Sequence, residues 1–474
     1  MLSVTQLMVA LDATVINIAL PRAQRDLGFS LANRQWPVTA YVLAFGSLLL
    51  LGGRLVDLWG RRTSLLVGLV GFAGASAVGG AATSFSMLVS ARAVQGAFGA
   101  ILAPAALATL SMTFDEPVGR AKAFSIYGVL GGSGAAIGLL LGGALTQWAS
   151  WRWSLYINLV FAFVALVGVV VFVTAKRGDH HEPLDVTGSV LASVGLFLVV
   201  FGLGHAVTSS WSNPVTWGSL AFGVLIVAGF VAWQGHSPHP LLPLRIIANR
   251  MRSGSLVALF LTSIAIFGIT LFLVYYLQGT LGYSPLRTGV ALMPMVLALA
   301  LSATLASARL LAMVGPRPLV PVGMLLGALG MVLFTRLAPD ANYLDNVLPG
   351  LIVSGLGLGL IFAPAIASAT AGVRHGDAGA ASALVNTTQQ IGSSIGLALL
   401  NTIAVTVTAR AMNHSYPSGA ALTVARQATL HGYAVAFWWA AGSFGLGAVL
   451  SFLLLESGAV QDEEAPEPQM SGQG

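Results

Sequence analysis

Apolar runs of about 20 residues recur along the whole of this 474-residue chain, separated by short polar links. An α-helix rises about 1.5 Å per residue, so each run is long enough to cross a hydrocarbon layer about 30 Å thick. Only 8% of the residues are charged, whereas a soluble domain carries roughly 25%. Backbone N–H and C=O groups inside a bilayer must form hydrogen bonds with one another, and an α-helix forms all of them within one apolar run. The sequence therefore predicts an all-α membrane protein.

Fourteen apolar runs qualify as membrane spans. They cover roughly residues 2–22, 37–56, 63–82, 86–112, 121–146, 153–174, 185–206, 214–234, 254–279, 286–312, 318–337, 346–371, 378–409 and 432–455. An even number of spans places both termini on one side of the membrane. With that side taken as cytoplasmic, the inner links hold about 13 Lys and Arg residues and the outer links about 8. We therefore predict a multi-pass protein of the cell inner (plasma) membrane with both termini cytoplasmic.

The lengths of the links divide the chain into parts. The two longest inner links, around Lys176–Asp185 and Gln234–Met251, bracket the seventh and eighth spans, so the spans group as six, two and six. We predict an N-terminal six-helix bundle over 1–175, two linker helices over 176–250, a C-terminal six-helix bundle over 251–456 and a disordered acidic cytoplasmic tail over 457–474. Two bundles facing a midplane site are the usual plan of a transporter. A receptor or a membrane-embedded enzyme is the alternative at this stage.

What the chain lacks narrows its chemistry. Cysteine is absent, which excludes disulfides, thiolate metal sites and cysteine catalysis. The sequence also contains no phosphate-binding loop with Lys-Ser or Lys-Thr, no Ser nucleophile elbow and no zinc-binding His pair. We therefore expect no use of ATP, no enzymatic activity, no metal and no cofactor. The net charge of +6 is scattered over the links, so it indicates membrane topology rather than nucleic-acid binding.

Asp12 lies inside the first apolar run, in the stretch LDATVINIALP at 11–21. About ten residues separate it from either end of the span, so its carboxyl is expected near the middle of the bilayer. A carboxylate there costs on the order of 3 kcal/mol or more, and such acids usually serve ions, protons or substrates. Arg92 is the other charge that we place deep in a span.

Two motifs stand out in the first half of the chain: Gly53-x-Leu55-x-Asp57-x-x-Gly60-Arg61-Arg62 and Leu88-x-x-x-Arg92-x-x-Gln95-Gly96. The first resembles the loop 2–3 signature of the major facilitator superfamily, and the second resembles the fourth-helix motif of the same family. Motifs of its fourteen-helix drug:proton antiporters resemble LDATVINIALP, WRWSLYIN at 151–158, YLQGTLGYSPLRTGVALMPM at 276–295 and GAASALVNTTQQIGSSIG at 379–396. The link VGPRP at 314–318 is similar to a degenerate repeat of the loop 2–3 signature. The resemblance covers essentially the whole chain, in order.

Two positions depart from the family pattern. Leu58 stands where a basic residue usually follows the loop carboxylate, which weakens the charge relay expected at this loop. The fifth-helix antiporter motif has proline where this chain has Leu139, although the glycine face survives. The resemblance therefore implies the fold, two pseudo-symmetric six-helix bundles around a central cavity, more firmly than it implies antiport.

The resemblance assigns roles to residues at matching positions. It implies proton coupling by Asp12 and Arg92, and a conformational switch built from Gly53, Asp57, Gly60, Arg61 and Arg62. It also implies a hinge and helix-packing face formed by Gly134, Gly138, Gly142 and Gly143. The alternatives are a static ion pair that locks helices 1 and 4, and a charged loop that only obeys the positive-inside rule.

Polar residues inside other apolar spans are candidates for the substrate cavity. They are Asn17, Gln95, Tyr127, Gln278, Asn386 and Gln390. For each of them the alternative is a hydrogen bond between helices. A single deep acid favours neutral or monocationic lipophilic substrates.

The sequence thus predicts a monomeric, proton-coupled antiporter that exports small lipophilic organic compounds, drugs or an antibiotic, by alternating access. Its expected partners are the small-molecule substrate, protons and the lipid bilayer. Two alternatives stay open. The first is a proton-coupled carrier of the same fold for an endogenous metabolite, peptide or lipid precursor. The second is a sensor that binds a ligand without transporting it.

Overall fold

A computed structural model describes residues 1–30, 33–113, 134, 137–173, 185–208, 213–238, 240, 244–371, 378–413 and 421–456. All regular structure in these ranges is helical, which confirms the predicted all-α class. Twelve of the described helices are long and apolar enough to cross a membrane, by length and composition. Two shorter apolar helices, Trp36–Leu49 and Ile137–Trp148, coincide with the second and fifth predicted spans. The predicted count of fourteen is not reached by this criterion, since most of the fifth span lies outside the described residues.

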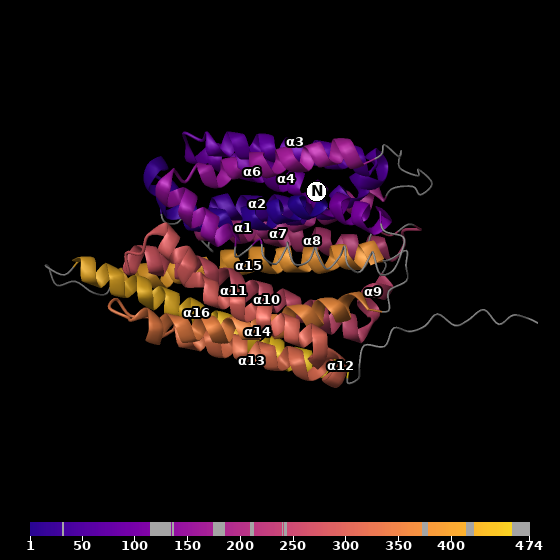
Figure 1. Cartoon of the computed structure of the whole chain (residues 1–474). Helices are drawn as coiled ribbons and strands as arrows, with labels where there is room; N and C mark the ends of the chain where they lie inside the picture. Colours follow the sequence, from indigo (N-terminus) through magenta and orange to yellow (C-terminus); the bar gives the residue numbers. More distant parts are fainter. Residues whose placement is uncertain are drawn as a thin grey trace, which may run out of the picture.

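The N-terminal helices form one bundle, drawn in indigo to magenta in Figure 1. Its members are α1 (Leu2–Leu27), α2 (Trp36–Trp59), α3 (Arg61–Gly80), α4 (Phe85–Thr113), the helix Ile137–Trp148 and α6 (Trp153–Phe172). Gly28 ends α1 in a left-handed conformation, with φ 70°, which a residue without a Cβ adopts at little cost. Within the bundle α4 packs against α1, α2 and α3, and α6 packs against α1 and α3.

The C-terminal helices form a second bundle, drawn below the first in Figure 1. Its members are α9 (Leu244–Ala248), α10 (Arg250–Tyr275), α11 (Pro285–Leu305), α12 (Leu311–Val314), α13 (Pro316–Phe334), α14 (Leu348–Thr370), α15 (Ala378–Asn413) and α16 (Ala421–Leu454). Three π-helical turns adjoin them, at Tyr276–Thr280, Ala306–Leu310 and Tyr343–Val347. The predicted domain boundaries remain a prediction.

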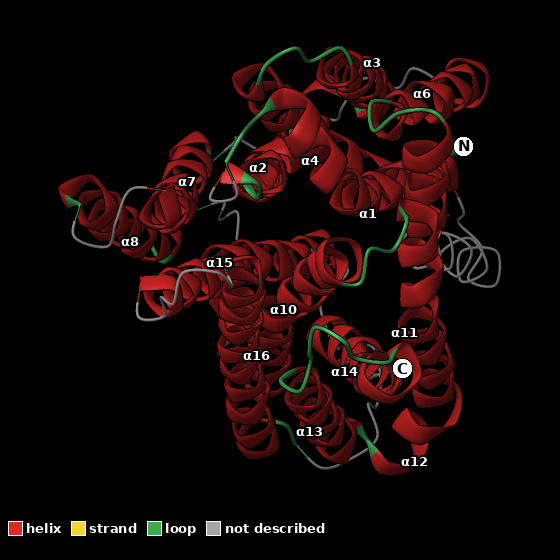
Figure 2. Cartoon of the chain, turned by 90° about the vertical axis from the view of Figure 1, so that its left-hand side faces the viewer, coloured by secondary structure: helices red, strands yellow, loops and turns green. Residues whose placement is uncertain are grey.

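Two further helices lie beside the interface between the bundles. They are α7 (Val186–Thr208) and α8 (Pro214–Gln234), which pack against each other. Helix α7 packs against α2 on one side and α15 on the other, and Figure 2 shows α8 at the edge of the molecule. The burial of the helices agrees with this arrangement. In the span of α8, 17% is buried inside the protein, whereas in the span that contains α10 the buried share is 71%.

The same one-glycine turn occurs once in each bundle. Gly60 joins α2 to α3 with φ 78°, and Gly315 joins α12 to α13 with φ 72°. Side chains other than glycine are strained at such positive φ values. Gly315 belongs to the VGPRP link, so the backbone supports its interpretation as a repeat of the loop 2–3 signature.

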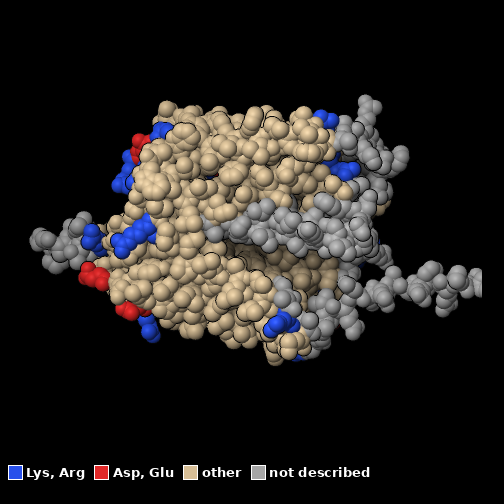
Figure 3. Space-filling model, viewed as in Figure 1, with Lys and Arg blue, Asp and Glu red and all other residues tan. Residues whose placement is uncertain are grey.

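The surface is apolar around the middle of the molecule and charged at its two ends, as Figure 3 shows. Large apolar side chains are exposed on the outer helices, among them Phe163, Phe172, Phe222 and Leu225. In water such a band would be costly, whereas in a bilayer it faces lipid. Figure 3 also shows that the surface is recessed between the two bundles, to the right of its centre.

Candidate functional site

A buried ion pair forms the centre of the candidate site. The Asp12 carboxylate on α1 lies 2.7 Å from Nη1 of Arg92 on α4, and each side chain is only 1% exposed. The pair therefore joins the two deepest charges that the sequence contains. Each charge neutralises the other in a place that water does not reach. This pairing explains how both charges are tolerated inside apolar spans.

Three polar residues complete the shell around the carboxylate. Nε2 of Gln95 and Nδ2 of Asn158 both donate to Asp12 Oδ1, over 2.8 and 2.7 Å. The same two nitrogens also lie 2.6 and 3.0 Å from the Ser76 hydroxyl. All three side chains are buried. Asp12 is thus held by helices α1, α3, α4 and α6 at once.

Arg92 has partners beyond the carboxylate. Its Nη1 also donates to Gln95 Oε1 over 2.7 Å, and its Nε donates to the Pro37 carbonyl oxygen over 3.1 Å. Its guanidinium lies 4.3 Å from the ring centre of Tyr41, so the cation also contacts an aromatic face. Pro37 and Tyr41 both belong to α2, so this helix also contacts the buried cation.

This arrangement suits reversible proton binding. The three side chains that bind the carboxylate, those of Arg92, Gln95 and Asn158, all donate to it, so the shell matches the ionised acid. A proton arriving on the carboxylate would remove the charge that Arg92 neutralises and would require an acceptor in place of a donor. Protonation therefore changes the interactions among all the helices that meet here.

The predicted switch loop lies at the end of α2 and the start of α3. Gly60 forms the turn, and Gly53 lies about two helical turns earlier, on the same helix as Asp57. Nη2 of Arg62 donates to the Val170 carbonyl oxygen on α6 over 3.4 Å. The side chain of Asp57 lies outside the described part of the structure, so its pairing with Arg61 stays a prediction.

The predicted glycine face packs closely on other helices. A Cβ added at Gly134 would lie 2.7 Å from Cβ of Ala10, and one at Gly142 would lie 3.0 Å from the Val15 carbonyl oxygen, both on α1. A Cβ at Gly138 would lie 2.0 Å from the Thr14 hydroxyl of the same helix. The absence of side chains at these positions lets α1 approach closely.

Gly143 faces the other bundle instead. A Cβ there would lie 2.7 Å from the Pro285 carbonyl oxygen and 2.8 Å from Cα of Leu286, at the start of α11. From the opposite side, a Cβ at Gly289 would lie 2.4 Å from the Leu139 carbonyl oxygen. Glycines on both helices thus allow the two bundles to touch through their backbones.

Further contacts join the bundles near the links at 28–35 and 281–284, a region that we call the closed end. Nδ2 of Asn401 on α15 donates to Oε1 of Gln35 over 2.6 Å, with both side chains buried. The guanidinium carbon of Arg34 lies 4.1 Å from the ring centre of Tyr275 on α10. Nε2 of Gln278 donates to the Ile18 carbonyl oxygen over 3.2 Å. In the predicted topology this end faces outward.

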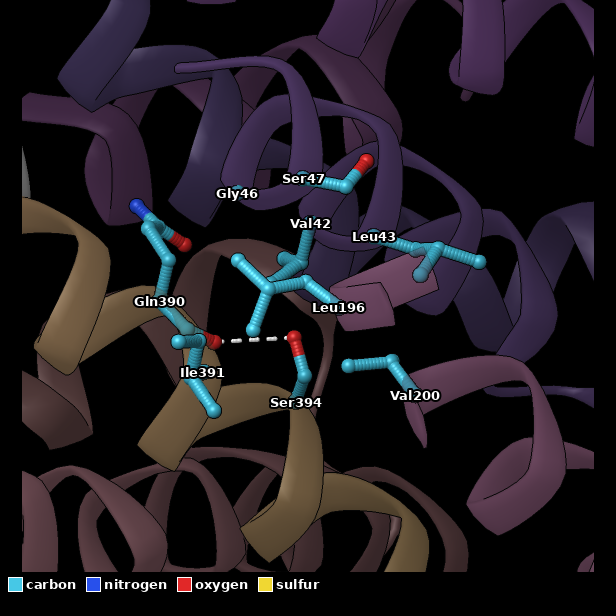
Figure 4. Close-up of a pocket in the computed structure, with 9 residues that line it drawn as sticks. All are labelled: Val42, Leu43, Gly46, Ser47, Leu196, Val200, Gln390, Ile391 and Ser394. Carbon is cyan, nitrogen blue, oxygen red and sulfur yellow. Dashed lines mark hydrogen bonds between the residues drawn. The ribbon is translucent and has the colours of Figure 1, made fainter. Parts of the chain in front are cut away.

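A small pocket lies where α2, α7 and α15 meet, and Figure 4 shows it. It is lined by Val42, Leu43, Gly46, Ser47, Leu196, Val200, Gln390, Ile391 and Ser394. The Ser394 hydroxyl donates to the Gln390 carbonyl oxygen within α15, over 2.8 Å. A Cβ on Gly46 would lie 3.1 Å from Cβ of Gln390, so the bundles meet closely beside the pocket.

The residues predicted for the substrate cavity occupy different environments. Gln95 belongs to the Asp12 shell, Gln278 contacts α1 at the closed end, and Gln390 lines the pocket. Asn17 is buried and donates to the Ala13 carbonyl oxygen of its own helix over 3.3 Å. Asn386 is exposed, and Tyr127 lies outside the described residues.

Sequence reasoning missed Asn158, Ser76 and Gln35. Asn158 ends the WRWSLYIN motif and is an amide inside an apolar span of mean hydropathy 2.7, which is the signal that singles out Asp12 and Arg92. Ser76 has no comparable signal, because serine is common in apolar helices and bonds readily to its own backbone. Gln35 lies in a polar link, where a glutamine is an ordinary residue and gives no signal of a special role.

Comparison with known proteins gives a consistent result. A family model described as Major Facilitator Superfamily matches residues 2–397. The puromycin resistance protein pur8 of Streptomyces alboniger is 46% identical over 454 residues, which are 95% of this chain and 90% of that protein. The cephamycin export protein CmcT of Amycolatopsis lactamdurans is 36% identical over 84% of this chain and 82% of its own. The tetracenomycin C resistance and export protein of Streptomyces glaucescens is 34% identical over 84% of this chain and 73% of its own.

Solved structures show the same fold. The crystal structure of a bacterial homolog to the human lysosomal transporter Spinster, in an inward-facing and unoccupied conformation, superposes with a TM-score of 0.66. The alignment covers 96% of this chain and 95% of that one, with 15% sequence identity. At that identity the likeness describes the arrangement of helices alone.

Proposed function

The chain belongs to the Major Facilitator Superfamily, as its motifs predicted, and on that premise we propose that it exports small lipophilic organic compounds, antibiotics among them, in exchange for protons. Relatives whose names refer to puromycin, cephamycin and tetracenomycin C support an antibiotic-like substrate. The observation that carries proton coupling is the Asp12 carboxylate, buried in a shell of donors from α4 and α6. No metal or organic cofactor is part of the proposal.

Asp12 carries the proton and Arg92 holds the carboxylate ionised between cycles. When a proton binds, the charge attraction between α1 and α4 is lost and the hydrogen bonds from α4 and α6 must rearrange. When it leaves, the ion pair forms again. The alternating gain and loss of one buried charge gives the bundle two arrangements, which is what coupling to a proton gradient requires.

Alternating access is achieved by rocking the two bundles against each other. The contacts at the closed end, together with the recess visible in Figure 3, support a state that opens toward the cytoplasm. The excess of Lys and Arg on the predicted inner links supports cytoplasmic termini in a cell inner membrane. The Gly60 turn stabilises one of the two states, and the protein functions as a monomer.

The proton gradient is large enough for this task. One charge moved through 100 mV is worth about 2.3 kcal/mol. Because about 1.4 kcal/mol corresponds to a factor of ten, one proton per cycle sustains roughly a fiftyfold gradient of a neutral substrate.

The test compares wild type with Asp12→Asn in sealed liposomes under an imposed pH gradient. Puromycin and a fluorescent lipophilic cation serve as substrates, and their efflux is measured with the gradient present and after a protonophore has collapsed it. We expect gradient-driven efflux in wild type and its loss in Asp12→Asn. Equal gradient-driven efflux in both would remove Asp12 from the mechanism. Absence of efflux of either compound from wild type would contradict the proposed substrate class.

A further inference from the structure

Asn158 has an unused acceptor beside the proton site. Its Nδ2 donates to Asp12 Oδ1 over 2.7 Å and to the Ser76 hydroxyl over 3.0 Å. Its Oδ1 is buried and has no hydrogen-bond partner. A buried amide oxygen without a partner has lost its hydrogen bonds to water without replacement, so its presence requires an explanation.

Protonation of Asp12 creates a demand for such an acceptor. A carboxylic acid donates one hydrogen bond, whereas the carboxylate only accepts. The other acceptors in the described shell are already engaged, because Gln95 Oε1 accepts from Arg92 and the Ser76 hydroxyl accepts from two amides. Among these side chains, Asn158 supplies the one acceptor that is free.

The geometry points to Asn158 as a positioning residue for the coupling proton. Rotation of its amide by half a turn about the last side-chain bond exchanges the nitrogen and the oxygen. The nitrogen donates to Asp12 while the carboxylate is ionised, and the oxygen accepts from Asp12 once the proton is bound. This inference rests on the proposed function, in which Asp12 carries the proton.

The step is balanced in atoms and charge. A proton from water forms an O–H bond on Asp12, which becomes neutral, and no other bond is broken. The amide rotation exchanges one unpaired atom for another, because the oxygen gains a partner as the nitrogen loses one. Among the described residues, the charged group beside this position is the Arg92 guanidinium, which lies against the Tyr41 ring, and neither Arg92 nor Tyr41 needs to change its protonation.

Infrared difference titration of the protein in lipid bilayers tests this role without a transport substrate. The carboxylic C=O band that disappears in Asp12→Asn reports the protonation of Asp12. Asn158→Leu has nearly the same shape but can neither donate nor accept, so both forms of Asp12 lose a hydrogen bond. The bond to the ionised carboxylate is the stronger of the two, so ionisation loses more than protonation does. We expect the titration midpoint of the band to move upward by about one pH unit. Asn158→Asp places a second carboxyl beside the first and is expected to move the midpoint at least as far, because like charges oppose ionisation.

Ser154→Ala is the matched control. Ser154 is buried on the same helix, 3.2 Å from the Thr146 hydroxyl, and lies outside the Asp12 shell. We expect its midpoint to equal that of wild type. A wild-type midpoint in both Asn158 variants would overturn the role of Asn158 while leaving Asp12 as the carrier. A wild-type spectrum without a titrating band that depends on Asp12 would instead contradict the proposed function itself.

Discussion

Nη1 of Arg92 and Oδ2 of Asp12 lie 2.7 Å apart, although the two residues are 80 positions apart in the chain. The contact joins α4 to α1 in the interior of the N-terminal bundle. A buried ion pair of this kind has two possible roles. It holds the two helices together permanently, or it breaks and reforms in each transport cycle. The two roles predict different effects of mutation on stability and on transport. A variant in which both partners are changed therefore distinguishes them.

Removal of one partner is expected to destabilise the protein whichever role is correct. In Arg92→Ala the Asp12 carboxylate stays buried without its cation, which typically costs about 3–5 kcal/mol. In the double variant Asp12→Asn/Arg92→Gln both side chains are neutral and can still form hydrogen bonds. We expect the double variant to recover most of the thermal stability lost in Arg92→Ala. We also expect it to lack gradient-driven efflux, and efflux at the wild-type rate would show that the pair is static.

The closed end must open during transport if the bundles alternate. The chain contains no cysteine, so a cysteine pair can be introduced without altering any native thiol. We expect Gln35→Cys/Asn401→Cys, linked by a short bifunctional thiol reagent, to lose efflux almost completely. Cleavage of a reducible linker should restore it. The two single-cysteine variants, treated in the same way, control for modification alone, and full activity of the linked protein would mean that this end does not open.

Gly143 is expected to influence which state is populated. An added Cβ lies within 3 Å of backbone atoms at the start of α11, so Gly143→Ala forces the two bundles apart there. Overpacking of this kind typically costs about 1–3 kcal/mol, and the cost falls on the closed state. A cysteine placed at Asn401 should therefore react several-fold faster with a water-soluble thiol reagent in Gly143→Ala.

Gly74→Ala is the control for this substitution. Gly74 lies on α3, and an added Cβ has no atom within 4 Å. Alanine is the better helix former, so this variant should be at least as stable as wild type and should leave the labelling rate unchanged. Equal labelling in the two glycine variants would mean that contact at Gly143 does not hold the end closed.

The contact between the two linker helices, α7 and α8, is expected to weaken in acid. Asp185 lies directly before α7 and accepts hydrogen bonds from the Gly188 backbone, the Trp233 indole and the Gln234 amide. Burial raises the pKa of Asp185, but these hydrogen bonds and the positive charge of Arg54 together lower it below its ordinary value of 3.8. A carboxylate with a lowered pKa stabilises the fold above its unfolded-state pKa, and this contribution is lost as the pH falls through the folded-state value.

Thermal unfolding measured between pH 7 and about pH 3 tests the role of Asp185. Wild type should lose more stability than Asp185→Asn over this range, so the two curves converge as the pH falls. Glu456→Gln, at an exposed position after α16, controls for the loss of one carboxylate. Parallel curves for wild type and Asp185→Asn would mean that this carboxylate contributes nothing to the attachment of α7 and α8.

The sequence by itself determined the class of the protein and most of its spans. Whether a stretch of about 20 residues can cross a bilayer depends on its own hydropathy, which no distant residue alters. The same local property singled out Asp12 and Arg92, because a charge inside an apolar run is costly wherever the helix lies in the bundle. The glycine at the α2–α3 turn is also a local requirement, set by the left-handed φ at that position.

The tertiary structure decided which of these residues meet. The rotation and tilt of each helix depend on how it packs against its neighbours, so residues 80 and 146 positions away reach the Asp12 carboxylate. Packing also placed α7 between α2 and α15, and it joined Gln35 to Asn401 across the closed end. Asn158 carries a local signal in the sequence, as an amide inside an apolar span, but only the folded protein shows that it lies against the Asp12 carboxylate.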